Sequence, residues 1–318
     1  MAKGEFGLID YIKTHFEVPD GVVGIGDDCA TLPEGGGDRL ITTDMLLEGV
    51  HFLRSKSEPE DVGWKSAAVN LSDIAAMGGT PIATFLSIAL PKDAQGEWAE
   101  RFVKGYADIS NRFGVPLLGG DTTSSLRDIA INVGVVGRCE RGKALGRGGA
   151  RVGDTIFVTG TLGDSGAGLR ALLDGLERTP DVEFLIGKHL RPLPRIKEGQ
   201  KLLATGVVGA MMDVSDGIAS DLGHILRASG VGASVELDAL PVSPQLGAIC
   251  QQQGWDAHEL ALSAGEDYEL LLTAPEELAT MVDFPLFPIG KITEGEPKIE
   301  WYKGGAKVEF NGKGYTHF

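Results

Sequence analysis

Cysteine is scarce in this chain: its 318 residues include three, at positions 29, 139 and 250. Their odd number and wide separation indicate neither a disulfide framework nor a zinc site. No apolar run approaches the length of a membrane-spanning helix, and the N-terminus lacks a signal-peptide profile. We therefore expect a reduced, cytoplasmic protein without a membrane partner.

Positive charge is also in short supply. The formal net charge is −16, and lysine and arginine form no cluster. Nucleic-acid binding needs a positive footprint, so a nucleic-acid partner is not expected. A nucleotide substrate remains compatible with this charge, because metal ions can bridge an acidic protein to an acidic ligand.

Several catalytic signatures are missing as well. None of the Gly-Lys pairs is followed by Ser or Thr, so there is no Walker-A loop. Metalloprotease, nucleophile-elbow and protein-kinase motifs are absent too. The glycines of segment 160–168 are interpreted as a tight turn and close helix packing rather than as a dinucleotide site. Any phosphate chemistry must use another scaffold.

What the chain does have is aspartate where predicted strands and helices begin or end. Eight residues share this placement: Asp27, Asp28, Asp44, Asp73, Asp121, Asp213, Asp216 and Asp221. Gathered together, such carboxylates repel one another unless cations neutralise them. Hard oxygen ligands of this kind suit Mg²⁺, which shares its shell between carboxylates, water and phosphate oxygens. The pattern indicates a magnesium-dependent enzyme that handles phosphate.

Simpler explanations compete at each position. Asp27 and Asp28 could cap a turn, and if they lie in a strand only one of them faces a given metal; we favour Asp28. Asp44 could form an Asx turn at the end of a strand, or it could contribute to a metal-binding site together with the oxygen atoms of its neighbouring threonines. Asp73 lies late in a predicted helix, where the macrodipole disfavours an anion, although plain exposure would also explain it.

The segment Asp213-Val-Ser-Asp216 leads from a predicted strand into a predicted helix. Asp216 or Ser215 is a plausible N-cap of that helix. Asp213 is harder to explain in this way, because it interrupts an apolar strand where an unpaired charge is costly. A metal ion would supply the missing partner.

Apolar periodicity and turn residues predict alternating helices and strands in both halves. Helices are expected at 5–16, 64–77, 97–113, 195–203 and 218–228 and after Asp164. Strands are expected near 39–43, 85–90, 115–118, 129–136, 155–159, 209–214, 270–273 and 289–292 and at Val235, with Gly119-Gly-Asp121 as a turn between two of them. The glycine-rich, basic segment 140–154 suggests domains of residues 1–145 and 146–318. The expected fold class is α/β or α+β.

Taken in order along the chain, ten segments resemble the thiamine-monophosphate kinase family of the aminoimidazole ribonucleotide synthetase-like superfamily. They run from Gly4-Glu-Phe to the C-terminal Gly314-Tyr-Thr-His-Phe, and include Gly24-Ile-Gly-Asp-Asp-Cys, Thr43-Asp-Met-Leu-Leu-Glu-Gly-Val-His-Phe, Asn70-Leu-Ser-Asp, Gly119-Gly-Asp-Thr-Thr, Asp213-Val-Ser-Asp-Gly and Ser263-Ala-Gly-Glu-Asp-Tyr-Glu-Leu. The resemblance implies an ATP-dependent conversion of thiamine monophosphate to thiamine diphosphate. It also implies a two-domain fold whose N-terminal sheets pair across a homodimer.

The same resemblance assigns roles to particular residues. The implied Mg²⁺ ligands are Asp28, Thr42, Thr43, Asp44, Asp73, Asp121, Asp213 and Asp216. The implied ATP contacts are Gly120, Asp121, Arg147 and Ser215, and the implied contacts to thiamine monophosphate are His51 and Glu266. Some relatives place a Trp near the C-terminus against the substrate; Gly312 stands here, so we expect Phe310 or Tyr315 to stack instead, with Tyr315 assigned to the substrate.

No general base is expected, because the acceptor is a phosphate whose second pKa is about 6 and which is therefore already anionic at neutral pH. The chemical difficulty is the repulsion between two anions, and we expect direct transfer without a phosphoenzyme. Two alternatives stay open: another ATP-using enzyme of the same superfamily, and a nucleotide- or thiamine-phosphate-binding sensor without turnover.

Overall fold

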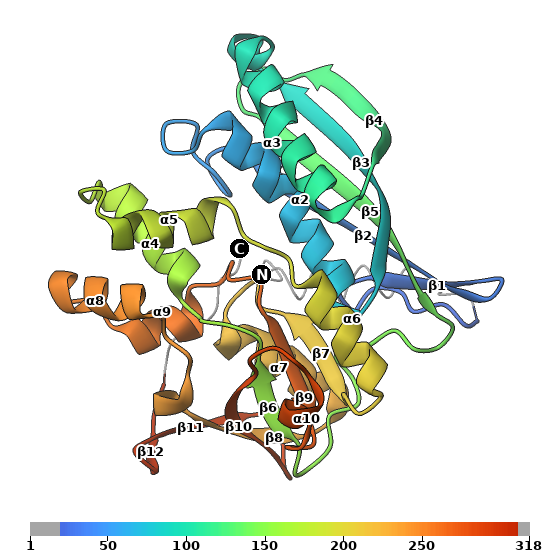
Figure 1. Ribbon diagram of the computed structural model, residues 1–318, viewed down its shortest axis with the longest axis vertical. Coiled ribbons are helices and arrows are strands. Elements are labelled where there is room, and N and C mark those ends of the chain that lie inside the picture. The colour runs from blue at the N-terminus through green and yellow to red at the C-terminus, as the bar shows by residue number, and fades with distance from the viewer. Residues whose placement is uncertain (1–19, 311–318) are drawn as a thin grey trace, which may run out of the picture.

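The computed structural model describes residues 20–310 (Figure 1). The first half of the chain builds a five-stranded sheet in the order β1-β2-β5-β3-β4. Its strands are β1 (Ala30–Glu34), β2 (Gly37–Leu47), β3 (Thr80–Leu90), β4 (Leu117–Ser124) and β5 (Ala130–Glu140). Only the β3–β4 pair of this sheet is parallel.

Two helices, α2 (Pro59–Ala76) and α3 (Glu97–Phe113), pack together on one face of this sheet. Alternate residues of β2 point toward them, so Leu40, Thr42 and Leu46 are buried. Among residues 20–310 no helix covers the opposite face, on which Met45 is 53% and Phe85 is 43% exposed. One face of the sheet is therefore a core and the other is apolar surface.

The second half builds a seven-stranded sheet in the order β12-β11-β8-β10-β6-β9-β7. Its strands are β6 (Thr155–Val158), β7 (Ala210–Asp213), β8 (Gly232–Glu236), β9 (Leu270–Ala274), β10 (Phe287–Thr293), β11 (Ile299–Lys303) and β12 (Ala306–Val308). The helices of this half are α4 (Asp164–Asp174), α5 (Pro180–Leu190), α6 (Ile196–Thr205), α7 (Ile218–Ser229), α8 (Pro244–Gln253), α9 (Ala257–Ser263) and α10 (Leu278–Met281). The expected mixed fold class is confirmed.

Helix α2 belongs to both halves. It starts with Pro59 and two acidic residues in its first turn, which suit a helix N-terminus. It is buried along nearly its whole length, and it contacts α5, α6 and β7 as well as the first sheet. At Gly199 of α6 an added Cβ would lie 2.2 Å from the carbonyl oxygen of Ala75, so the two helices meet at backbone distance. Residues placed on α2 are therefore fixed relative to both halves.

Two local expectations are wrong. Gly119-Gly-Asp121 is not a turn, because β4 runs through it as an edge strand paired with β3. The N-cap of α7 is Gly217, without a side-chain cap, rather than Ser215 or Asp216. The helix expected at 5–16 lies outside the described residues. Within residues 20–310, no helix has both the length and the apolar composition needed to cross a bilayer.

Candidate active site

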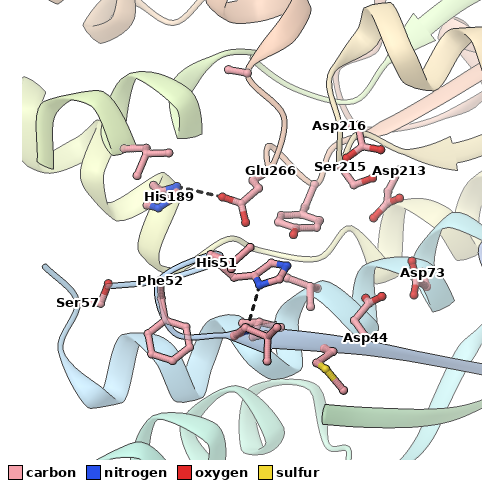
Figure 2. A pocket seen from close by; sticks show the side chains of 18 of the residues that line it. Asp44, His51, Phe52, Ser57, Asp73, His189, Asp213, Ser215, Asp216 and Glu266 are labelled. Atoms are coloured by element: carbon pink, nitrogen blue, oxygen red, sulfur yellow. Dashed lines mark hydrogen bonds and ion pairs between the residues drawn. The ribbon is translucent and has the colours of Figure 1, made fainter. Parts of the chain in front are cut away.

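A cavity of about 1040 Å³ lies between the two halves of the chain. One wall comes from residues before β1, from β2 and the loop after it, and from α2; the other comes from α4, α5, the end of β7 and the loop before β9. Six of the eight aspartates line it: Asp27, Asp28, Asp44, Asp73, Asp213 and Asp216. Carboxylates that are up to 189 residues apart in sequence thus share one cleft (Figure 2).

Three of these carboxylates form the tightest group. Asp28, Asp73 and Asp213 each present an oxygen within 4.8 Å of the others. They come from the segment before β1, from α2 and from the end of β7. Ser72, next to Asp73 on α2, donates a 2.5 Å hydrogen bond from its Oγ to Asp213 Oδ2 and so joins the two halves at this point.

The charges of the group are poorly compensated by protein. Burial raises the pKa of Asp28 to about 7, although Arg147 opposes the shift and Asp213 adds to it. Burial likewise raises the pKa of Asp73 well above its usual range, with further repulsion from Asp44 and Asp213. Oδ2 of Asp28 is buried and has no hydrogen-bond partner among the described residues. Such a donor set fits a hard divalent cation, which supplies both charge and coordination.

Asp44 lies beside this group on the middle of β2, a half-buried position. Burial and the neighbouring Asp28 raise its pKa to about 6. Its backbone N–H donates to Asn70 Oδ1 on α2 at 2.8 Å, which fixes the strand against the helix. The two threonines before it point to opposite faces: Thr42 is buried and donates to Asp73, whereas exposed Thr43 accepts from Asn132 at 2.9 Å.

The turn after β7 holds Ser215 and Asp216 at the cleft (Figure 2). Asp221, buried in the first turn of α7, accepts hydrogen bonds on Oδ2 from the backbone N–H groups of residues 215, 216 and 217 at 3.1–3.2 Å. This carboxylate performs the capping that sequence analysis gave to Ser215 or Asp216. Ser215 and Asp216 do not cap the helix and both line the cleft.

Arg147 belongs to the segment between β5 and β6 that connects the two halves, and it lies against the acidic group. Its Nη2 donates to Asp28 Oδ1 at 2.6 Å, and its backbone N–H donates to Asp27 Oδ1 at 2.9 Å. Nε of Arg147 is buried without a partner among the described residues. Asp27 thus accepts a hydrogen bond from the backbone of the connecting segment, whereas Asp28 belongs to the group with Asp73 and Asp213. Asp28 is the one of the two that sequence analysis favours as a metal ligand.

The other end of the cleft is more apolar. His51, Phe52, His189 and Glu266 lie there, away from Asp73 and Asp213 (Figure 2). Its apolar lining includes Leu47, Val50, Leu169, Leu172 and Leu173. His51 accepts a 3.0 Å hydrogen bond on Nδ1 from the backbone N–H of Leu47, so its ring is fixed against the last residue of β2. The cleft therefore has an acidic end and an apolar end with one carboxylate, Glu266.

Three expected site residues are not brought together with the rest. Gly120 and Asp121 lie on exposed β4, separated from β2 by β5 and β3, and do not line the cleft. Phe310 packs edge-on against Trp301 at a ring distance of 5.5 Å, within the second core, so it does not line the cleft either. Tyr315 lies outside the described residues.

Some residues at the cleft were not found from sequence. Lys65 and Ser72 lie on α2 and bond to Glu266 and Asp213, and Tyr268 lines the cavity wall. The available signal was weak: Lys65 and Ser72 are polar residues buried in α2, but Ser66 and Asn70 of the same helix are polar and buried as well. Their partners are 201 and 141 residues away, so no local pattern identifies them.

Two family models match the chain. The model of the AIR synthase related protein N-terminal domain covers residues 26–139, and that of the C-terminal domain covers residues 151–302. The fold and the acidic interdomain cleft are thus those of an AIR synthase-related two-domain protein.

More similar relatives narrow this class. The thiamine-monophosphate kinase of Salmonella typhimurium is 41% identical over 330 residues, covering 100% of this chain and 99% of that protein. The thiamine-monophosphate kinase of Aquifex aeolicus is 42% identical, covering 99% and 98%. The solved structure "AaThiL complexed with AMPPCP and TMP" superposes with a TM-score of 0.89 at 41% identity, covering 99% of this chain and 97% of that one. This chain belongs to the thiamine-monophosphate kinase family.

Proposed function

We propose that this protein transfers a phosphoryl group from ATP to thiamine monophosphate, giving thiamine diphosphate and ADP. The observation that carries the proposal is the gathering of six aspartates in one interdomain cleft of a chain from this family. A cleft with an acidic end and an apolar end suits two substrates that each carry phosphate, with the ring system of thiamine monophosphate at the apolar end. The kinases named above support the same reaction by similarity.

We assign the acidic end to Mg²⁺, with Asp28, Asp73 and Asp213 as the central ligands. Around them we place Thr42, Asp44, Asp216 and the backbone carbonyl of Thr43, whose side chain points to the other face of the sheet. Bound there, the ions would neutralise the carboxylates and hold the phosphate oxygens of both substrates. Without such neutralisation, two unit negative charges 4 Å apart repel by roughly 4 kcal/mol at an effective dielectric constant of 20. The aspartates thus serve positioning and charge balance, and no side chain has to remove a proton.

Arg147 and Ser215 are assigned to ATP, and His51 and Glu266 to thiamine monophosphate. Arg147 offers an unpaired buried Nε beside the aspartates, which suits a phosphate oxygen. His51 and Glu266 lie at the apolar end, where a heteroaromatic ring would be sheltered from water (Figure 2). Tyr315 remains a predicted substrate contact. The cytoplasmic location also remains a prediction.

A homodimer is part of the proposal. The face of the first sheet that no helix in the described part of the chain covers carries Ile41, Met45 and Phe85, each more than 40% exposed, and β4 beside them is exposed throughout. An apolar sheet face of this kind is a typical interface between identical subunits. Asp121 points to the same face as exposed Met45. Across the sheet Asp121 pairs with Ser87, Ser87 pairs with Asn132, and Asn132 pairs with Met45, and paired residues point to the same side. We propose that the sheets pair through this face and that Asp121 completes the cleft of the second copy.

The reaction is tested by measuring ADP release with Mg²⁺ and ATP, with and without thiamine monophosphate. Formation of ADP and thiamine diphosphate in equal amounts, abolished by EDTA, is the expected result. Binding of thiamine monophosphate without ADP release would instead identify a sensor. ATP turnover that ignores thiamine monophosphate would indicate another reaction of the superfamily. Covalent phosphoprotein trapped from labelled ATP would contradict direct transfer.

A further inference from the structure

Glu266 is held in a strained loop at the apolar end of the cleft. It has a φ of 57°, and Tyr268 two residues on has 51°, a left-handed conformation that disfavours residues with a Cβ. The Glu266 N–H donates to the carbonyl of Ser215 at 2.8 Å, and the Tyr268 N–H donates to the carbonyl of Val214 at 2.9 Å. Strain of this kind persists where the surrounding structure imposes it, and it is a starting point for a functional hypothesis.

Lys65 supplies a cation directly behind this carboxylate. It lies on α2, is 3% exposed, and reaches across the interface between the two halves. Its Nζ is 2.8 Å from Oε1 and 2.9 Å from Oε2 of Glu266, so the ammonium contacts both carboxylate oxygens. A buried lysine is costly unless it is paired, and here the partner is a residue that lines the cleft while Lys65 does not.

His189, from the end of α5, lies on another side of Glu266. Its Nδ1 is 3.4 Å from Glu266 Oε2 and 3.1 Å from Ser165 Oγ. Burial and the nearby Lys65 lower the pKa of His189 to about 3, so the ring is neutral at physiological pH. Burial alone would raise the pKa of Glu266, but the charge of Lys65 and its hydrogen bond to the carboxylate outweigh burial, so that pKa is lowered. Lys65 is therefore the charge that keeps Glu266 ionised.

We propose that Lys65 is a positioning residue for the thiamine phosphate substrate. Its ammonium contacts both oxygens of Glu266 and orients the charged carboxylate toward the ring system that binds at the apolar end of the cleft. This inference rests on the proposed function. A carboxylate accepts up to about four hydrogen bonds, so lone pairs of Glu266 remain for the ligand. Because Lys65 acts through Glu266 and not at the acidic end, it governs the KM for thiamine monophosphate and not the KM for ATP.

The test compares Lys65→Met, Lys65→Arg, Glu266→Gln and the double variant Lys65→Met/Glu266→Gln in steady-state kinetics. Lys65→Met should raise the KM for thiamine monophosphate about tenfold or more, since a charged hydrogen-bonding partner of the contact is lost. The KM for ATP should stay within about twofold, and Lys65→Arg should restore much of the loss. In the double variant the KM should match that of Glu266→Gln alone, because the effect of Lys65 passes through Glu266.

Lys201→Met is the matched control, because it removes a lysine that pairs with Asp283 on the exposed surface. It should change neither KM. Lys65→Met leaves Glu266 as a lone buried charge and could therefore fail to fold. In that case the double variant, which removes both charges, is compared with Glu266→Gln, and Lys65→Arg, which keeps the positive charge, is compared with the wild-type protein. An unchanged KM for thiamine monophosphate in folded Lys65 variants, or additive effects in the double variant, would overturn the inference. An inactive wild-type protein would instead overturn the proposed function itself.

Discussion

The placement of Asp121 predicts that active sites are shared between subunits. Across the sheet, Asp44 of β2 pairs with Val133, Val133 with Leu86, and Leu86 with Gly120, the neighbour of Asp121. Three strand spacings of about 4.8 Å separate Asp44 from Gly120 by about 14 Å. Asp121 also points to the face opposite that of Asp44, because successive residues of a strand alternate.

This geometry excludes a shared metal cluster within one chain. Mg²⁺ binds oxygen at about 2.1 Å. Two ions of a two-metal site lie about 4 Å apart, so their outermost ligand oxygens are separated by about 8 Å. The Cα separation across the sheet is larger than this, and the side chains diverge. If Asp121 serves the reaction, it serves the cleft of the partner subunit.

The experiment coexpresses Asp44→Ala and Asp121→Ala chains with two different affinity tags and purifies the mixed dimer. One of its two clefts then contains both aspartates and the other contains neither, so a two-fold dimer should show about half of the wild-type activity. Each variant alone should be inactive. A mixed dimer of Asp44→Ala and Asp213→Ala is the control, since both residues line one cleft and no intact site forms. Absence of recovery in the first mixed dimer would refute the reasoning.

Three further outcomes follow from the site and the core. Asp213→Ala should lower turnover by more than about 10²-fold while leaving the circular dichroism spectrum unchanged, since the residue supplies charge and not packing; near-normal turnover at saturating Mg²⁺ would remove it from the site. The pKa of Asp28 is raised to about 7 in the folded protein, so without Mg²⁺ the free energy of unfolding should fall as pH rises from about 4 to about 7. Mg²⁺ needs the ionised carboxylate, and it should therefore raise the melting temperature more at neutral pH than at about pH 5. An equal effect at both pH values would contradict this. Gly199→Ala should lower stability by about 1–3 kcal/mol in denaturant titrations, because its Cβ would meet the backbone of α2, whereas Gly187→Ala, where a Cβ meets no atom within 4 Å, should be neutral or stabilising.

Sequence patterns predicted best the elements whose own residues define them. Helix α3 was predicted with its observed bounds, because its apolar stripe is regular and Gly114 ends it in a left-handed conformation with a φ of 65°. The glycines at 119 and 120 misled, because glycine usually marks a turn. In β4 they lie in an edge strand instead, and an added Cβ on Gly120 would meet the carbonyl of Leu86 at 1.7 Å.

Sequence analysis likewise found some residues of the candidate site and missed others. The aspartates were recognisable because they stand where predicted strands and helices begin or end, and six of them do converge. The capping role of Asp221 was missed, since it reaches back to N–H groups four to six residues before it rather than forward. Lys65 gave only a weak signal, as one of several polar residues in α2, because its partner Glu266 comes from the other half of the chain.

The sharing of α2 between the halves has a consequence for how the protein unfolds. The core around α2 includes Phe157, Leu202 and Leu272 from the second half together with Leu40 and Ile131 from the first. If either half unfolded alone, this shared core would be exposed to water, so the two halves should unfold together. Amide protons in the middle of α2 should accordingly exchange only through whole-chain opening, and fragments separated within residues 140–154 should each lack a wall of their interior.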